Sequence, residues 1–162
     1  MKKEKNNQEK VRDFLQTHAV AVLSTMSYDD TPYAAAVYVV IDDVFNFYFL
    51  TKSDTKKSRF VLANNNAALT MVDAAIPMTL QATGTVTIVD EPETLSQLIV
   101  KYAEKNAQQI GNFHWPPTLA KLKGQGALWM YKFEPNWMRI GDFSDSDDIT
   151  VTKKDIFHQL IP

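Results

Sequence analysis

Residues 45–64 read FNFYFLTKSDTKKSRFVLAN. Aromatic residues dominate the first part, which favours a strand, and this strand is expected to end at Thr51. A short polar turn follows, and the apolar residues beyond the two lysines have the spacing of a helix. A strand that turns directly into a helix predicts a domain in which both kinds of element pack together.

The start of this helix has the features of a phosphate site. Lys56 and Lys57 stand in its first turn, and Thr51, Ser53 and Thr55 precede them. Backbone N–H groups at a helix start lack intrahelical acceptors, and the helix dipole favours an anion there. The hydroxyls and ammonium groups add further donors. Lysines at this spacing more often mark a solvated helix face, so the anion-site interpretation depends on the surrounding sequence.

On the N-terminal side the pattern predicts a meander. Residues 8–17 have helical spacing, residues 19–25 form a small apolar strand, and residues 27–32 have turn chemistry. Residues 33–42 resume as one strand, and the Asp42-Asp43 pair makes a tight connection to the aromatic strand. Short loops between consecutive strands are typical of antiparallel hairpins.

On the C-terminal side two strands precede a longer helix. Residues 67–73 form one strand, and residues 79–89 alternate cleanly between apolar and polar positions, with Gly84 predicting a bulge or bend. Asp90 is expected to cap the next helix, in which Pro92 is tolerated in the first turn. The apolar stripe of this helix comprises Leu95, Leu98, Ile99, Tyr102 and Ala103.

The remaining residues complete a barrel. Residues 106–126 look irregular, with one possible helical stretch after Pro116-Pro117, and residues 127–133 and 136–140 predict two closing strands broken at Pro135. Thr152 with Asp155 fits the start of a last short helix. The pattern predicts a single α+β domain over residues 1–162, built on a small antiparallel β-barrel.

Bulk composition narrows the classes of function. The formal net charge is −2 and the isoelectric point is about 5.9, which argues against nucleic acid as a partner. No apolar run is long enough to cross a membrane, and the charged N-terminus does not read as a secretory signal. The absence of cysteine excludes disulfides and thiolate chemistry, so a cytoplasmic location is expected. No histidine pair has metal-site spacing.

Three segments of the sequence resemble the pyridoxamine 5′-phosphate oxidase-like family of FMN-binding split barrels. They are AVLSTMSYDDTPYAAAVYVV, FYFLTKSDTKKSRFVLANNNAALTMVD and QATGTVTIVDEPE, at residues 21–40, 47–73 and 81–93. The resemblance implies a six-stranded antiparallel Greek-key split barrel with about three to five flanking helices. It also implies a homodimer that holds FMN in clefts between the subunits.

The resemblance also suggests which positions would contact FMN. It implies that the basic pair and the preceding hydroxyl hold the phosphate, that the second strand and the end of the aromatic strand lie beside the flavin, and that positions from the partner complete the cleft. The matching residues are Lys56, Lys57, Thr55, Thr51, Leu50, Ala35, Ala36, Val37, Thr79, Gln81 and Trp137. The sequence identifies no catalytic acid or base and no metal ligand.

Two departures separate the chain from true pyridoxamine phosphate oxidases. Ala35 stands where those enzymes have an arginine, and their C-terminal substrate motif is replaced by the acidic stretch from Asp142 to Asp148. The chain is therefore more similar to the general-stress-protein-like members. The expected function is that of an FMN-dependent oxidoreductase. A non-catalytic flavin-storage or sensing protein stays open, as does a split barrel that uses haem or a deazaflavin.

Overall fold

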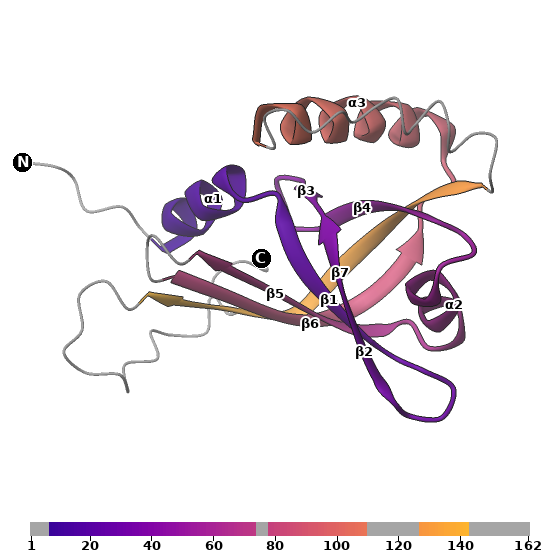
Figure 1. Ribbon diagram of the computed structural model, residues 1–162. Coiled ribbons are helices and arrows are strands. Elements are labelled where there is room, and N and C mark those ends of the chain that lie inside the picture. The colour runs from indigo at the N-terminus through magenta and orange to yellow at the C-terminus, as the bar shows by residue number, and fades with distance from the viewer. Residues whose placement is uncertain (1–6, 74–77, 110–126, 143–162) are drawn as a thin grey trace, which may run out of the picture.

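The computed structural model describes residues 7–73, 78–109 and 127–142 of the chain (Figure 1). Three helices and seven strands lie within these residues. The helices are α1 (Asn7–Thr17), α2 (Lys56–Ala63) and α3 (Pro92–Gln109). The strands are β1 (Val20–Met26), β2 (Pro32–Tyr38), β3 (Val40–Ile41), β4 (Phe47–Lys52), β5 (Asn66–Asp73), β6 (Met78–Ile88) and β7 (Leu128–Asp142).

All seven strands form one antiparallel sheet in the order β2-β1-β5-β6-β7-β4-β3. The sheet curls strongly, as Figure 1 shows, and β2 comes close to β4. Its two edge strands, β2 and β3, are consecutive in sequence and are joined through Val39, whose N–H donates to the carbonyl of Ala19 at 2.7 Å. The α+β barrel prediction is confirmed, but the expected single strand over residues 33–42 is wrong, because the chain bends at Val39 to pass from one edge to the other.

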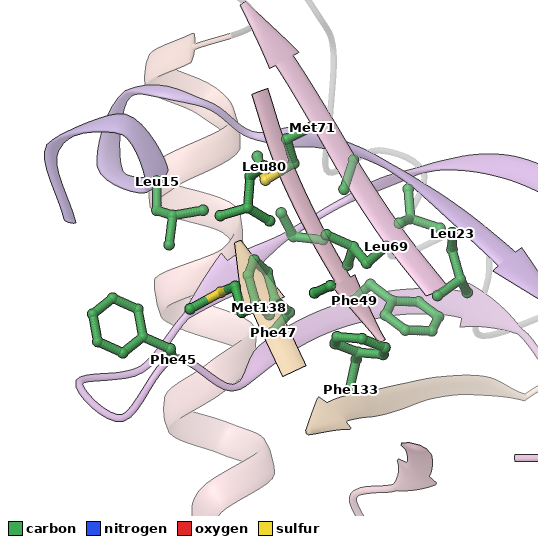
Figure 2. Packing of buried hydrophobic residues seen from close by; sticks show 14 of the residues in the cluster. Leu15, Leu23, Phe45, Phe47, Phe49, Leu69, Met71, Leu80, Phe133 and Met138 are labelled. Atoms are coloured by element: carbon green, nitrogen blue, oxygen red, sulfur yellow. The ribbon is translucent and has the colours of Figure 1, made fainter. Parts of the chain in front are cut away.

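The main core fills the concave side of the sheet. Figure 2 shows large apolar side chains from β1, β4, β5, β6 and β7 packed together, with Leu15 of α1 closing one end. Phe49 and Tyr131 stack with ring centroids 5.3 Å apart, and Phe47 meets Phe133 edge-on at 5.9 Å. These offset and edge-on ring contacts supply packing beyond simple burial.

A second core lies between α3 and the convex side of the sheet. Tyr48 and Leu50 of β4 and Met130 of β7 pack against Tyr102, while Leu98 is partly buried beside them. The apolar stripe predicted for this helix therefore faces the sheet, apart from Ala103, which lies outside the cluster. Figure 1 shows α3 running across the β3-β4 end only, so β1, β2 and β5 are not covered by it.

The bulge predicted at Gly84 is present, and the register between β6 and β7 shifts between Thr83 and Gly84. A Cβ at Gly84 would stand 2.1 Å from the carbonyl oxygen of Glu134, so a larger residue does not fit there. The strand break predicted at Pro135 is wrong. Pro135 lies opposite the bulge, where the ladder is already disrupted, and β7 runs through it unbroken.

Two details of α3 also differ from the prediction. Its first N–H groups are capped by Glu91, whose carboxylate accepts from Glu93 N at 3.2 Å and Thr94 N at 2.6 Å, and not by Asp90. The helix extends to Gln109, beyond the expected start of irregular structure at residue 106. The predictions for residues 110–126, including the stretch after Pro116-Pro117, and for the last helix at Thr152 concern residues outside the described ranges.

No helix among the described residues is long and apolar enough to span a membrane. Within the same residues, no cluster of three or more histidine, aspartate or glutamate side chains is arranged to hold a metal ion.

Candidate functional site

The turn between β4 and α2 forms the candidate site, and Thr55 organises it. Thr55 has extended backbone angles (φ −74°, ψ 157°), and its hydroxyl oxygen accepts from Ser58 N at 3.4 Å. This is the geometry of a helix N-cap. The first intrahelical bond runs from Arg59 N to the Thr55 carbonyl at 3.1 Å. The N–H groups of Lys56 and Lys57 therefore precede the helical ladder and are available to an external acceptor.

The hydroxyls around Thr55 bond to one another and to the chain. Ser58 Oγ donates to the Lys52 carbonyl at 2.7 Å, and Thr55 Oγ1 lies 3.0 Å from the same carbonyl and 3.1 Å from Ser58 Oγ. Thr51 Oγ1 lies 3.4 Å from Thr55 Oγ1. Because one hydroxyl carries one proton, Thr55 is occupied by holding the turn. Its predicted role as a phosphate donor competes with two acceptors inside the chain.

The two lysines at the helix start differ in environment. Lys56 is exposed, whereas Lys57 is partly buried, and this burial lowers the pKa of its amine. No carboxylate of the described residues lies within ion-pairing distance of Lys57. A desolvated ammonium beside unbonded helix N–H groups is stabilised by an anion.

Strand β2 runs beside α2 at the open edge of the sheet. Tyr33 of β2 meets the ring of Phe60 edge-on at a centroid distance of 5.6 Å, which joins the strand to the helix. Ala36 is exposed, Ala35 is intermediate, and Val37 is 4% exposed within the main core. The side chain of Val37 is thus unavailable to a ligand, and only its backbone can serve as a contact.

The two predicted positions at the end of β4 also differ. Thr51 is buried and reaches the Thr55 hydroxyl, so it belongs to the α2 turn. The Leu50 side chain packs with Tyr102 and Met130 in the cluster beneath α3. Leu50 therefore offers the α2 turn backbone atoms and no side chain.

Thr79, Gln81 and Trp137 are not beside the α2 turn. They lie on β6 and β7, where Leu80, Ala82 and Met138 point into the core, so the positions that alternate with these three point to the convex face. Lys52 at the end of β4, next to the α2 turn, pairs with Leu128, whereas Gln81 pairs with Arg139, eleven residues further along β7. At about 3.3 Å per residue these two positions are about 36 Å apart along the strand. Within a single chain, these three residues are therefore distant from the lysines of α2.

On the convex face of the sheet, β2, β1 and β5 carry apolar side chains that are exposed to solvent. Val20 and Val22 of β1 are 48% and 42% exposed, and Val72 of β5 is 62% exposed. Ala34 and Ala36 on β2 are also exposed. Together these five side chains form the convex patch, which spans three neighbouring strands of the part of the chain that the structure describes.

Sequence reasoning did not identify Ser58, which is 1% exposed and holds the turn at the Lys52 carbonyl. Its position three residues after a threonine cap was the available signal, because a polar N3 residue commonly completes such a cap. It also missed Tyr33 and Phe60, whose contact depends on the tertiary fold.

The histidines have separate roles or positions. His18 lies between Phe14 O at 2.6 Å and the Asp73 carboxylate at 2.8 Å, so it ties the end of α1 to the end of β5. His114 and His158 lie outside the described residues, as does the acidic stretch beyond Asp142.

The chain is similar to known proteins over most of its length. The sequence profile described as Pyridoxamine 5'-phosphate oxidase matches residues 8–139. A conserved hypothetical protein of Mycobacterium tuberculosis superposes with a TM-score of 0.69 and 16% identity, over 92% of this chain and 97% of the other. No curated protein sequence matches this chain.

Two further solved structures share the architecture. The haem storage protein HutZ of Vibrio cholerae has a TM-score of 0.65 and 13% identity, over 83% of this chain and 92% of its own. General stress protein 26 of Bacillus anthracis has a TM-score of 0.61 and 18% identity, over 82% and 92%. At these identities the likeness establishes the split-barrel fold.

Proposed function

Because this chain belongs to the pyridoxamine 5′-phosphate oxidase family, we propose that it binds FMN with the phosphate at the N-terminus of α2 and acts as a flavin-dependent oxidoreductase. The observation that carries the proposal is that the partly buried Lys57, whose pKa is lowered by burial, belongs to the same helix start as the unbonded N–H groups of Lys56 and Lys57. The residues present fit a dianionic phosphate in donor type and charge.

The phosphate contacts alone do not supply the affinity. A hydrogen bond to a charged group contributes about 1.5–3 kcal/mol net, whereas micromolar binding needs about 8 kcal/mol. Two such bonds contribute about 3–6 kcal/mol and leave a remainder that burial of the flavin ring has to supply. The small side chains of Ala35 and Ala36 on β2 allow a flat ring to approach the strand, which supports binding along this edge.

We propose that the ring is enclosed by a second copy of the chain. Thr79, Gln81 and Trp137 are displaced from the lysines within one chain, and the convex patch connects the two regions. A homodimer that buries this patch removes the exposed valines from water and lets Gln81 and Trp137 of one subunit approach the flavin of the other. FMN affinity and dimerisation are then linked.

In this proposal the chain positions the cofactor, and the flavin supplies the redox chemistry by accepting a hydride or single electrons. Lys57 and the α2 N–H groups hold the phosphate, and the Thr55 and Ser58 hydroxyls fix the turn that presents them. The proposed substrate is not a vitamin B6 phosphate, because an alanine replaces the expected arginine at Ala35.

Comparing FMN with riboflavin tests the phosphate site directly, since the two ligands differ only in the phosphate. The wild-type protein is expected to bind FMN at least about 100-fold more tightly than riboflavin, as two charge-assisted bonds predict. In the Lys56→Ala/Lys57→Ala variant the difference should fall below about tenfold, while riboflavin binding stays unchanged. Equal loss of both ligands in a folded variant would place the phosphate elsewhere.

Absorption spectroscopy of the purified protein separates the cofactor alternatives. The fold is shared with a haem storage protein, so haem is the second candidate, and a deazaflavin is the third. Flavin, haem and deazaflavin have distinct spectra, and each ligand can be added back to the apoprotein. Reduction of bound FMN by NADH or NADPH, followed by reoxidation with a quinone, supports an oxidoreductase. Binding without reduction would indicate a storage or sensing protein.

A charge placed on the convex patch tests the dimer. Val22→Glu should give a monomer that has lost most FMN affinity, because a buried unpaired carboxylate disfavours the interface. Val44→Glu is the matched control, since Val44 is 71% exposed in the β3–β4 turn and lies away from the patch. Analytical ultracentrifugation and FMN titration report the two properties, and a monomeric variant with wild-type affinity would refute the linkage.

A further inference from the structure

A cationic cavity lies between α1, the β3–β4 turn and α3, separate from the α2 turn. Its volume is about 140 Å³, and Arg12, Lys101 and Lys105 line it together with Asp42 and Asp43. About 10–15 Å³ of such space holds one water molecule, so the cavity has room for a compact solute of several non-hydrogen atoms. None of these residues belongs to the proposed FMN site.

Backbone carbonyls hold all three cationic groups in place. Lys105 Nζ donates to Leu15 O at 2.8 Å, Lys101 Nζ donates to Ile41 O at 2.6 Å, and Arg12 Nη2 donates to Asp43 O at 2.9 Å. An ammonium has three N–H donors and a guanidinium has five. Each group therefore keeps donors for a further acceptor after its position has been fixed.

Neither carboxylate of the cavity lies within ion-pairing distance of Lys101 or Lys105. Asp42 accepts from Val44 N, Asn46 N, Asn46 Nδ2 and Tyr48 Oη at distances of 2.8 to 3.0 Å, so its oxygens are used within the turn. The side chain of Asp43 is fully exposed and its nearest ion pair is Arg12 at 3.8 Å. Burial, together with the nearby charge of Lys101, lowers the pKa of Lys105 to about 8.

We propose that this cavity is a second anion site, which binds a compact oxyanion with two negative charges, such as inorganic phosphate or a short dicarboxylate. Lys101 and Lys105 would contact the anion from α3, and Arg12 from α1. Such an anion bridges two helices and the β3–β4 turn, so its binding stabilises the docking of both helices on the barrel. The site is independent of FMN.

Titration calorimetry with phosphate and with succinate tests the proposal and distinguishes the two kinds of anion. The full-length Lys56→Ala/Lys57→Ala protein is used, so that the α2 turn does not contribute and failure of the FMN proposal does not affect the result. One saturable site is expected for at least one of the two anions. Absence of saturable binding by both anions would overturn the proposal.

Variants in the same background assign the site. Lys101→Met and Lys105→Met should each weaken binding at least about tenfold, the loss expected for one charge-assisted bond. Lys132→Met is the control, because Lys132 pairs with Glu134 on β7 at 2.5 Å and lies outside the cavity. Equal affinity in the two test variants and the control would overturn the assignment. Lys101 is exposed, so its variant keeps the test decisive if Lys105→Met does not fold.

The pH dependence gives an independent readout. Arg12, Lys101, Asp42 and Asp43 are the charged groups that line the cavity with Lys105, and Lys105 is the one that changes charge near pH 8. The anion should bind the ammonium form, so affinity should fall as pH rises above about 8, with proton uptake on binding. In Lys105→Met the residual affinity should lose this dependence. A pH-independent wild-type affinity between pH 7 and 9.5 would contradict the proposed contact.

Discussion

Lys57 at the start of α2 and Lys105 in the cavity are both partly buried amines, but they differ in their hydrogen-bond partners. Burial lowers the pKa of each amine. Lys105 already donates to the Leu15 carbonyl at the end of α1, and two other cations share its surroundings. Lys57 stands beside unbonded helix N–H groups and has no such carbonyl among the described residues.

This difference separates a residue that stabilises the apoprotein from one kept for a ligand. A lysine that donates to the last carbonyls of a helix contributes to the helix end whether or not an anion is present. A desolvated lysine beside open N–H groups has an energetic cost until an anion binds. The α2 turn is therefore expected to depend on its ligand, whereas the cavity has a structural role and an additional binding role.

The largest expected effect is on the pH dependence of stability through Lys105. Its folded pKa of about 8 lies below its ordinary value of 10.5, so the unfolded chain binds more protons between these two pH values. The free energy of unfolding of the wild type should therefore rise relative to Lys105→Met, by up to about 3 kcal/mol from pH 8 to 10.5. Urea denaturation at several pH values measures this difference. Parallel pH profiles would show that the folded amine titrates normally.

The next largest effect compares the neighbouring lysines of α2. Lys57→Met should lower FMN affinity about 30-fold, which is within the range for one charged hydrogen bond, without lowering the stability of the apoprotein. Lys56→Met should lower the affinity less than about fivefold, because its exposed ammonium is screened by solvent. FMN fluorescence titration and thermal unfolding measure the two properties. Equal losses of FMN affinity in the two variants would show that the partial burial of Lys57 does not strengthen its contact with the phosphate.

A smaller effect concerns the support of the α2 turn. Ser58→Ala removes the 2.7 Å bond to Lys52 O and should destabilise the protein by about 1 kcal/mol, since the hydrogen bond of a buried side chain is lost while Thr55 still donates to the same carbonyl. Ser96→Ala is the matched control: Ser96 Oγ donates to Pro92 O at 2.9 Å but is exposed on α3, so water replaces the lost donor. Equal stabilities of the two variants would show that burial of Ser58 does not matter.

The sequence predicted the α2 turn well because its signals are local. The strand end at Lys52, one residue beyond the predicted Thr51, the polar turn and the helix start at Lys56 lie within a few residues. The alternation that predicted the bulge at Gly84 lies within one strand. The two strand predictions that were wrong depend on contacts with other strands. Pro135 is tolerated within β7 because it faces the Gly84 bulge, and the bend at Val39 follows from closure of the sheet.

The functional sites divide in the same way. The lysine pair at α2 could be predicted because its two residues are adjacent in the sequence. The cavity brings together Arg12 and Lys101, which are far apart in the sequence, so no local pattern predicts it. The choice of Glu91 over Asp90 as the cap of α3 was also beyond the sequence, because two adjacent carboxylates offer the same chemistry. Tertiary geometry selects between them.

The smallest expected effect tests whether the cavity acts through its charge. Asp43→Asn leaves the Arg12 bond to the Asp43 backbone carbonyl in place and removes a carboxylate whose side chain is fully exposed, so protein stability should not change measurably. Phosphate affinity in the Lys56→Ala/Lys57→Ala background should rise about two- to threefold, because a solvent-screened negative charge at the cavity rim no longer repels the anion. The rise should disappear in high salt. Unchanged affinity at low salt would mean that direct hydrogen bonds, and not the net charge of the cavity, determine anion binding there.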